Sequence, residues 1–294
     1  MKVSVRPVGG LGNQLFIYAA GRALAAKYGG QLFVDSSGYT DSNPRDFELD
    51  SFASRFTERP ADLRFGKTLR QALDHASSAR QKIRQIIPNS QARRLNKAFI
   101  YKSPPTPTRE TLRLRGYLQS WRYFDLISGS LREELRDISE PSDWFLETTA
   151  RLAASPFSVG VHVRRGDYLS HPYMGIVPDS YYKSALSLIR DVQKDFTVYV
   201  FSDEPQEVQD SDFLEAWRKD VVFLAPPPES RPVETLNLMS SCDHLVMANS
   251  SLSWWGAWLG DRPSRYVIYP RPWLEGAYVD DRDLALPHWI SMGA

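Results

Sequence analysis

Hydrophobic and polar residues near the start of the chain alternate as in a β-strand over residues 3–8, and glycines follow directly. From Leu11 to Tyr28 apolar residues recur every three or four positions, which predicts a helix that Gly29 and Gly30 end. Residues 31–35 form a short apolar run typical of a second strand. The chain is therefore predicted to begin with a strand, a glycine-rich turn, a helix and a strand.

The second half of the chain repeats this alternation more regularly. Short apolar runs alternate with helical patterns, which predicts a parallel, doubly wound sheet with helices on both faces. The predicted strands are 158–163, 197–201, 221–224, 244–247 and 266–269, and the predicted helices are 179–192, 206–219, 233–242 and 250–259.

The middle of the chain is less regular. Residues 61–103 are polar and helical without a clear apolar stripe, and a proline-rich connector follows at 103–108. Residues 112–121 alternate like a strand, residues 126–135 look helical, and 153–156 mark a boundary between a helix and a strand. We therefore predict two α/β domains, 1–154 and 155–294.

Composition excludes several classes of protein. The chain has 294 residues of average soluble composition, and its single cysteine, Cys242, excludes a disulfide framework or a cysteine-built metal site. The five histidines lack metal-ligand spacing, so no metal is expected. No apolar run of membrane-spanning length and no signal peptide is visible, so a cytoplasmic location is expected.

Charge is distributed unevenly along the chain. Residues 64–122 carry 14 Lys and Arg side chains against two acidic ones, although the net charge of the whole chain is +1. Such a block is either a solvated helical face or a surface that contacts phosphates. Because no zinc-finger or RNA-recognition signature is present, we expect no nucleic-acid partner. A peripheral contact with the anionic inner face of a membrane is the favoured functional alternative.

The carboxyl ends of parallel strands meet at one edge of a sheet, where open α/β sheets bind ligands. The first polar segment expected there is Gly9-Gly10-Leu11-Gly12-Asn13-Gln14, between the first strand and helix. Glycines allow a close backbone approach to a ligand, and a helix N-terminus favours an anion. The segment fits neither the dinucleotide-binding nor the Walker pattern, so a plain turn is an equal alternative.

The second segment is His162-Val163-Arg164-Arg165-Gly166-Asp167, which ends an apolar strand. Guanidinium groups bind phosphate oxygens because they are planar, permanently charged and bidentate. An Arg–Asp ion pair that closes the loop is the structural alternative. It does not account for the second arginine and the histidine, so a phosphate site is the favoured interpretation.

Two further segments end predicted strands. Ser202-Asp203-Glu204 could place a carboxylate on a ribose or guanine, or could cap the next helix. Asn249-Ser250-Ser251 begins a helix, where hydroxyls and backbone amides face the sheet edge. The three tryptophans that follow, Trp254, Trp255 and Trp258, are predicted to pack in the core and between domains.

Together the four segments resemble the bacterial α-1,2-fucosyltransferases of glycosyltransferase family 11. The resemblance rests on GGLGNQLF, HVRRGDY, FSDE and ANSSLSWWGAWL, which occur in the family's order between residues 9 and 259. Glu204 and Leu252 depart from the aspartate and phenylalanine common in relatives. The basic middle region contributes nothing to the resemblance.

The resemblance implies a GT-B fold, in which an acceptor-side domain faces a domain that binds GDP-fucose. It implies inverting transfer of fucose to the 2-hydroxyl of a β-galactoside, in surface glycan synthesis, without a metal or other cofactor. The acceptor could be lipid-linked. Arg164, Asn13 and Asp167 are the implied catalytic residues. The implied donor-binding residues are Gly10, Gly12, Asn13, Gln14, His162, Arg164, Ser202, Asp203, Asn249, Ser250 and Ser251.

The general base is not assigned, because Asp167, Glu204 and His162 are equal candidates. Two other functions stay open at this point. One is a transferase of another linkage or another GDP-sugar. The other is a non-catalytic protein that binds nucleotides or polyanions, although a decayed site would be expected to lose charged groups such as Arg164.

Overall fold

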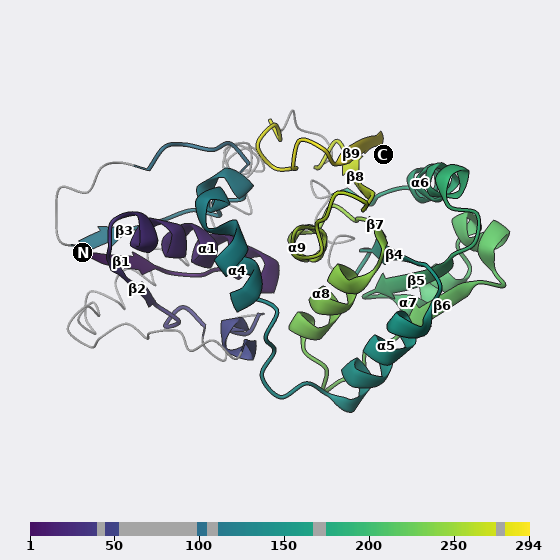
Figure 1. The fold of residues 1–294 in the computed structure, drawn as a ribbon, viewed down its shortest axis with the longest axis horizontal. Helices are drawn as coiled ribbons and strands as arrows, with labels where there is room; N and C mark the ends of the chain where they lie inside the picture. Colours follow the sequence, from purple (N-terminus) through teal and green to yellow (C-terminus); the bar gives the residue numbers. More distant parts are fainter. Residues whose placement is uncertain (40–44, 53–98, 105–110, 167–174, 275–279) are drawn as a thin grey trace, which may run out of the picture.

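The computed structural model describes residues 1–39, 45–52, 99–104, 111–166, 175–274 and 280–294. Two parallel sheets lie at opposite ends of this described part, and helices α1 and α9 lie between them (Figure 1). The three-stranded sheet has the order β2-β1-β3 and the six-stranded sheet the order β6-β5-β4-β7-β8-β9. The strands are β1 (Lys2–Val5), β2 (Gln31–Val34), β3 (Thr111–Arg113), β4 (Ser158–Val163), β5 (Thr197–Ser202), β6 (Val221–Leu224), β7 (His244–Val246), β8 (Val267–Arg271) and β9 (Ile290–Gly293).

The described helices connect these strands in the predicted alternation. The α-helices are α1 (Leu11–Lys27), α4 (Ser128–Glu134), α5 (Asp143–Ala154), α6 (Asp179–Val192), α7 (Pro205–Gln209), α8 (Pro232–Ser241) and α9 (Ser251–Leu259). Short 3-10 helices are η1 (Leu49–Ser51), η3 (Trp121–Tyr123), η4 (Asp125–Ile127) and η6 (Asp212–Trp217).

The six-stranded sheet is doubly wound, as the sequence predicts. All its described neighbouring strands pair in parallel, and counting from β4 gives the strand order 3-2-1-4-5-6. In this order the chain reverses its direction of winding between β4 and β7. Ligands of such sheets bind where this reversal opens a crevice at the carboxyl ends of the strands. The fold therefore directs attention to the residues that follow β4 and β7.

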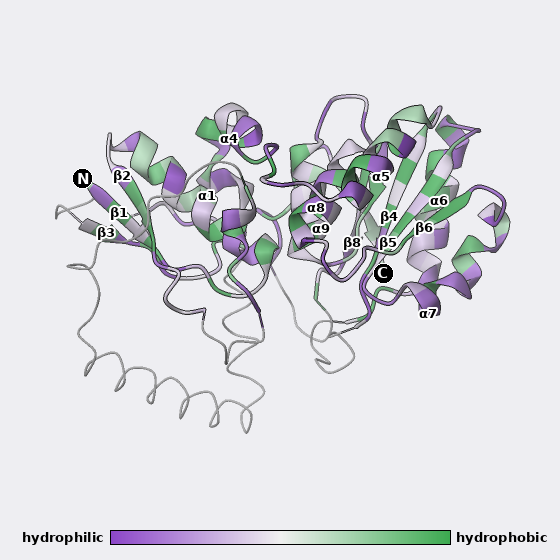
Figure 2. Cartoon of the chain, turned by 90° about the horizontal axis from the view of Figure 1, so that it is seen from below, coloured by the Kyte–Doolittle hydropathy of each residue, from purple (hydrophilic) through white to green (hydrophobic). Residues whose placement is uncertain are grey.

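Alternation along the central strands supplies a core on each face of this sheet. Val159, Val161 and Val163 of β4 pack on the face covered by α6 and η6. Tyr199 and Phe201 of β5 pack on the opposite face with α8 and α9. Figure 2 shows the largely hydrophobic strands β4 and β5 lying between helices. A strand buried on both faces reads as a continuous apolar run, which is why the sequence predicted β4 correctly.

Helix α5 connects the two sheets. It packs against α8, beside which it lies in Figure 1. The side chain of Glu234 on α8 accepts hydrogen bonds from the backbone amide of Ser142 (2.7 Å) and from its hydroxyl (3.0 Å). The end of α5 at Ala154 coincides with the predicted boundary between domains 1–154 and 155–294, and that boundary stays a prediction.

Helices α1 and α9 are in close contact at their first turns. A Cβ atom on Gly12 would lie 2.5 Å from the backbone carbon of Ser251. The indole of Trp255 donates a buried hydrogen bond of 2.9 Å to the carbonyl of Gly12. Trp254, Trp255 and Trp258 are all buried, so their prediction as packing residues is confirmed. This contact joins the beginning of the helix after β1 to the beginning of the helix after β7.

Three elements differ from the sequence prediction. The strand predicted at 112–121 ends at Arg113, and the helix predicted at 206–219 is divided between α7 and η6. The sixth strand of the large sheet, β9, was not predicted.

The basic block 64–122 lies mostly outside the described residues, so the predicted contact with a membrane surface stays a prediction. No helix in the described ranges is both long enough and apolar enough to span a membrane.

Candidate active site

The two arginines that follow β4 point to opposite faces of the sheet, because side chains alternate along a strand. Arg164 has the parity of His162 and lies on the face covered by α8 and α9. Arg165 has the opposite parity and reaches the first turn of α6, where Asp179 accepts from its Nη2 at 2.7 Å. Its Nη2 also donates to the hydroxyl of Ser211 at 3.2 Å. Arg165 therefore joins elements of the fold, whereas Arg164 faces the candidate site.

Asp203 holds Arg164 in place. One carboxylate oxygen of Asp203 lies 3.2 Å from the Nε of Arg164, and the other accepts from the backbone amide of Arg165 at 3.1 Å. Asp203 follows β5, the strand beside β4, so the pairing joins two adjacent strand ends. Sequence analysis expected Asp203 to bind ribose or guanine or to cap a helix. In the structure Asp203 anchors the guanidinium of Arg164, and its predicted contact with the nucleoside stays a prediction.

A pocket of about 180 Å³ opens beside this ion pair. Arg164, Asp203 and Ser202 line it, as does Leu252 of α9. The lining residues that sequence analysis did not single out are Trp144, Phe201, Leu224, Pro226, Pro227, Ser230, Arg231, Pro232 and Thr235. Most of them lie in or after β6, whose end was predicted correctly, so the strand-end rule could have found them. Nothing in the sequence indicated Trp144 on α5.

Arg231 is the second guanidinium of this pocket. It lies immediately before α8 and donates to the backbone carbonyls of Ser139 and Glu140, the latter at 3.0 Å. These bonds fix the segment before α5 against the start of α8. The guanidinium-bearing side chains of Arg164 and Arg231 therefore both line the pocket.

His162 also lines the pocket and is 3% exposed. Burial, with a smaller contribution from the nearby Arg164 charge, lowers the pKa of His162 to about 3. Its Nδ1 is buried and has no hydrogen-bond partner among the described residues. A neutral imidazole with so low a pKa is a weak base. It offers a ligand a hydrogen bond rather than a charge.

We expect His162 to make folding sensitive to acid. Its pKa is about 3 in the folded protein and near its ordinary value when unfolded, so the unfolded chain binds more protons between these values. Its contribution to stability is complete above about pH 6.5 and is lost as the pH falls toward 3, by up to about 1.4 kcal/mol per pH unit. Urea unfolding at pH 8, 6, 5 and 4.5 should show a shallower loss for His162→Gln than for the wild type.

At pH 8 the histidine is neutral in both the folded and the unfolded protein. The difference in unfolding free energy between the variant and the wild type at that pH therefore measures the packing effect of the substitution alone. Parallel losses for the two proteins on acidification would show that His162 does not carry the effect.

The residues after β7 surround the first turn of α9. The side-chain amide of Asn249 donates to the backbone carbonyl of Gly175 at 3.2 Å. The hydroxyl of Ser250 accepts from the backbone amide of Leu252 at 3.3 Å. Ser250 is thus the N-cap of α9, and Ser251 is partly exposed in its first turn. This helix N-terminus lies at the reversal point of the sheet and carries no acidic residue in its first turn. It is suited to an anion.

The N-terminus of α1 is different, because the chain places its own carboxylate there. Glu48 accepts a hydrogen bond from the amide of Leu11, and burial raises the pKa of Glu48 despite that bond. Gln14 is fully buried and holds the same segment through the Glu48 amide (3.0 Å) and the Asp46 carbonyl (2.8 Å). An anion bound at this helix N-terminus, as the sequence led us to expect, would lie against the carboxyl group of Glu48. Gln14 and Gly12 have packing roles here, whereas Gly10 has open space around it.

Asn13 is the polar side chain of this turn that is partly exposed. Its Oδ1 accepts a hydrogen bond of 2.6 Å from Nε2 of Gln119, which comes from the segment after β3. Gln119 was not predicted as a site residue from the sequence. Predicting it would have required knowing that β3 is short, because the early end of β3 allows residues 116–120 to lie over the start of α1.

Asp167 lies outside the described residues, so its predicted role beside the arginines stays a prediction. In the described structure Asp203 and Asp179 pair with Arg164 and Arg165. Within the same described ranges, no three His, Cys, Asp or Glu side chains are grouped so that they could hold a metal ion. The predicted absence of a metal requirement is not tested by this observation.

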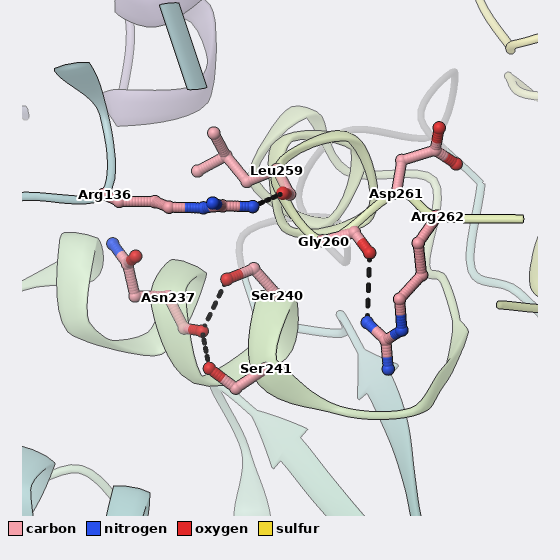
Figure 3. A pocket seen from close by; sticks show the side chains of 8 residues that line it. All are labelled: Arg136, Asn237, Ser240, Ser241, Leu259, Gly260, Asp261 and Arg262. Atoms are coloured by element: carbon pink, nitrogen blue, oxygen red, sulfur yellow. Dashed lines mark hydrogen bonds between the residues drawn. The ribbon is translucent and has the colours of Figure 1, made fainter. Parts of the chain in front are cut away.

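A larger cavity of about 400 Å³ lies elsewhere, at the carboxyl ends of α8 and α9 (Figure 3). Since α8 ends just before β7 begins, this cavity is at the opposite edge of the sheet from Arg164. Its polar groups bond one another: Arg136 donates to the carbonyl of Leu259, and Arg262 donates to that of Gly260. The cavity by Arg164 is smaller, but it is at the edge where such sheets bind ligands.

Comparison with known proteins identifies the family of this chain. Residues 97–293, which include β4 to β9 and the residues that follow β4 and β7, match the sequence model described as glycosyl transferase family 11. The chain belongs to glycosyltransferase family 11.

The relatives that this chain resembles are glycosyltransferases by name. The O-antigen biosynthesis glycosyltransferase WbnK of Escherichia coli is 28% identical over 97% of this chain and 98% of its own length. An α-1,2-colitosyltransferase of the same organism is 27% identical over 98% of both chains. The rabbit (Oryctolagus cuniculus) galactoside α-(1,2)-fucosyltransferase 2 is 29% identical over 66% of this chain and 56% of its own length. This chain is therefore a glycosyltransferase related to α-1,2-fucosyl- and α-1,2-colitosyltransferases.

The fold agrees with solved glycosyltransferase structures. The NodZ α-1,6-fucosyltransferase soaked with GDP-fucose superposes with a TM-score of 0.53 at 15% identity, covering 88% of this chain and 92% of that one. At this level of identity the likeness concerns the fold alone. The expected GT-B fold is thereby confirmed.

Proposed function

We propose that this protein transfers L-fucose from GDP-fucose to the 2-hydroxyl of a terminal β-galactoside, with inversion at the sugar carbon and without a metal. The transfer forms a bond between that hydroxyl oxygen and C1 of fucose while the bond from C1 to the diphosphate breaks. GDP leaves, and the hydroxyl proton goes to a base. The E. coli relative of O-antigen biosynthesis supports a role in surface glycan synthesis.

The observation that carries the proposal is Arg164, held by Asp203 at the carboxyl end of β4 in a family 11 chain. Negative charge develops on the diphosphate as the sugar departs. A cation already fixed in position stabilises that charge without reorganising at the moment of reaction. The Nε contact with Asp203 contributes to holding it there.

The pocket supplies the remaining contacts for a nucleotide. His162 has an unpartnered, buried Nδ1, which a hydroxyl or N–H group of the nucleoside would satisfy. Ser202 and Asp203 line the same pocket, and the N-terminus of α9 after Ser250 suits the diphosphate. Asn249 contributes through the hydrogen bond that its side-chain amide donates to the backbone carbonyl of Gly175. Asn13 approaches from the other sheet, beside the contact between Gly12 and Ser251.

The general base is not among the groups this proposal assigns. The low pKa of His162 makes it the weakest of the three candidates named from the sequence, whereas Glu204 follows Asp203 directly and is partly exposed. Asp167 lies outside the described residues.

A second donor has a specific observation in its favour. The colitosyltransferase relative matches 98% of this chain at 27% identity, to the same extent as the pig (Sus scrofa) galactoside α-(1,2)-fucosyltransferase 2, which matches 99% of it at 27% identity. Nucleotide-activated colitose is therefore the second candidate donor for the same site.

The experiment that tests the proposal measures GDP release from GDP-fucose with EDTA present, with and without a panel of β-galactosides. We expect release that depends on the acceptor, and a product linked at the galactose 2-hydroxyl. Release that requires an added divalent cation would contradict the metal-independent part. Turnover with activated colitose but not with GDP-fucose would assign the second donor, and absence of both turnover and GDP binding would overturn the nucleotide site.

A further inference from the structure

A side chain that the proposed function does not use is hydrogen-bonded to one that it does. Gln119 is 8% exposed, and its Nε2 donates to Oδ1 of Asn13 at 2.6 Å. An amide side chain has an acceptor end and a donor end. Because the acceptor end of Asn13 is taken by Gln119, its Nδ2 is the end left to face a ligand.

The direction of Nδ2 follows from the turn beneath it. A Cβ atom on Gly9 would lie 2.7 Å from Nδ2 of Asn13, so this nitrogen lies directly above the end of the β1–α1 turn. Gly9 has a positive φ of 77°, and its lack of a side chain leaves that position clear. The donor end of Asn13 is therefore at the carboxyl edge of the small sheet.

The same turn adjoins the donor site of the other sheet. Gly12, next to Asn13, touches the backbone of Ser251 and Leu252 in the first turn of α9. Leu252 in turn lines the pocket together with Arg164. Asn13 is thus one helix contact away from the residues proposed to bind the diphosphate.

The backbone around Gln119 carries strain. Leu118 has a φ of 51°, in the left-handed region that residues with side chains rarely occupy, and Gly116 has a φ of 114°. Strain of this kind persists where the surrounding structure requires a particular side-chain placement. Here it places Gln119 over the start of α1 and turns β3 away from the extended course that the sequence predicted.

We propose that Gln119 is a positioning residue that fixes the amide of Asn13 so that Nδ2 donates to an oxygen in the active site. The inference rests on the proposed function. The oxygen belongs either to the diphosphate of the donor or to the acceptor sugar, and both accept a hydrogen bond in the same way. An inverted amide would present Oδ1 to that oxygen, which places two acceptors against each other.

The test compares Gln119→Glu with Gln119→Met. A glutamate at this position can only accept, so Asn13 must turn its Nδ2 toward the carboxylate and its Oδ1 toward the ligand. A methionine removes the partner without forcing the inversion. We expect kcat/KM to fall by about ten-fold for Gln119→Met and by about a further ten-fold for Gln119→Glu, each step corresponding to loss of one hydrogen bond in the site.

The matched control is Gln193→Glu. Gln193 ends α6 on the surface and donates to the carbonyl of Asp195, far from the site, so this variant should keep wild-type kinetics. Unfolding midpoints of all three variants check that the fold is retained. Separate GDP titrations and acceptor KM values show which ligand oxygen is involved, because only the corresponding constant should weaken.

A Gln119→Glu variant as active as, or more active than, Gln119→Met would overturn the inference. A readout independent of activity is the side-chain amide signal of Asn13 in protein labelled with ¹⁵N-asparagine. That signal should move on Gln119→Glu substitution, as the NH₂ group gains a carboxylate partner, and an unchanged signal would also overturn the inference. Failure of the proposed function is distinguishable, because the wild type would then show no transfer while the amide signal still moved.

Discussion

Replacing Arg164 by alanine should reduce kcat for sugar transfer by about 10²–10³-fold while leaving the protein folded, because a fixed donor that stabilises developing charge contributes about that much. The effect should appear mainly in kcat, since charge on the diphosphate grows as the sugar leaves. Arg164 is 21% exposed and its described ion pair is with Asp203 at the end of the neighbouring strand. Its removal therefore leaves the core on both faces of the sheet intact.

Arg165→Ala is the matched control for this prediction. Arg165 follows Arg164 directly and also pairs with an aspartate, but its partners Asp179 and Ser211 lie on the α6 side of the sheet. Its loss should therefore lower the unfolding midpoint, while lowering kcat far less than Arg164→Ala does. Stopped assays of GDP release, with urea unfolding of the same preparations, separate the two effects. Equal losses of kcat in both variants would contradict the assignment of different roles to the two arginines.

The elements whose bounds were predicted correctly are those in which burial, on one face or on both, sets the pattern of apolar residues. Strands β4 and β6 and helix α6 have the predicted bounds, because continuous apolar runs and a 3.6-residue stripe leave little choice. Strand β3 is shorter than its alternating pattern because the chain leaves the extended conformation at Gly116 and Leu118, both of which have positive φ values. Strand β9 has only four residues, and its pairing with β8 across a long connection leaves no local pattern.

The sequence predicted which strand ends carry the candidate site residues, but it did not predict which side chains pair with one another there. The rule that ligands bind at the carboxyl edge selected Arg164, Asp203 and Ser250 from sequence alone. Which acid pairs with which arginine depends on the strand order, which places β5 beside β4, and on the alternation that separates Arg164 from Arg165. Glu48 and Gln119 were missed because each reaches the start of α1 from a distant segment. A single sequence carries no signal for such contacts.

The contact between α1 and α9 gives the second large effect, which concerns stability. A Gly12→Ala substitution would place Cβ 2.5 Å from the carbon and 2.6 Å from the backbone nitrogen of adjacent residues in α9. Backbone atoms cannot rotate aside, so the two helices must separate. Overpacking of this kind costs about 1–3 kcal/mol. The indole of Trp255 would be drawn from the Gly12 carbonyl, adding about 1 kcal/mol for a weakened buried hydrogen bond.

Gly129→Ala is the control, because Gly129 is the second residue of α4 as Gly12 is the second residue of α1. A Cβ there would meet no atom within 4 Å, so alanine should be neutral or should stabilise the helix by up to about 1 kcal/mol. Urea unfolding followed by tryptophan fluorescence reports this region directly, since Trp254 and Trp255 pack against Phe16 of α1. If Gly12→Ala were as stable as Gly129→Ala, the two helices would have to separate at no cost. The first turns of α1 and α9 would then not hold Asn13 and Ser251 at a fixed separation.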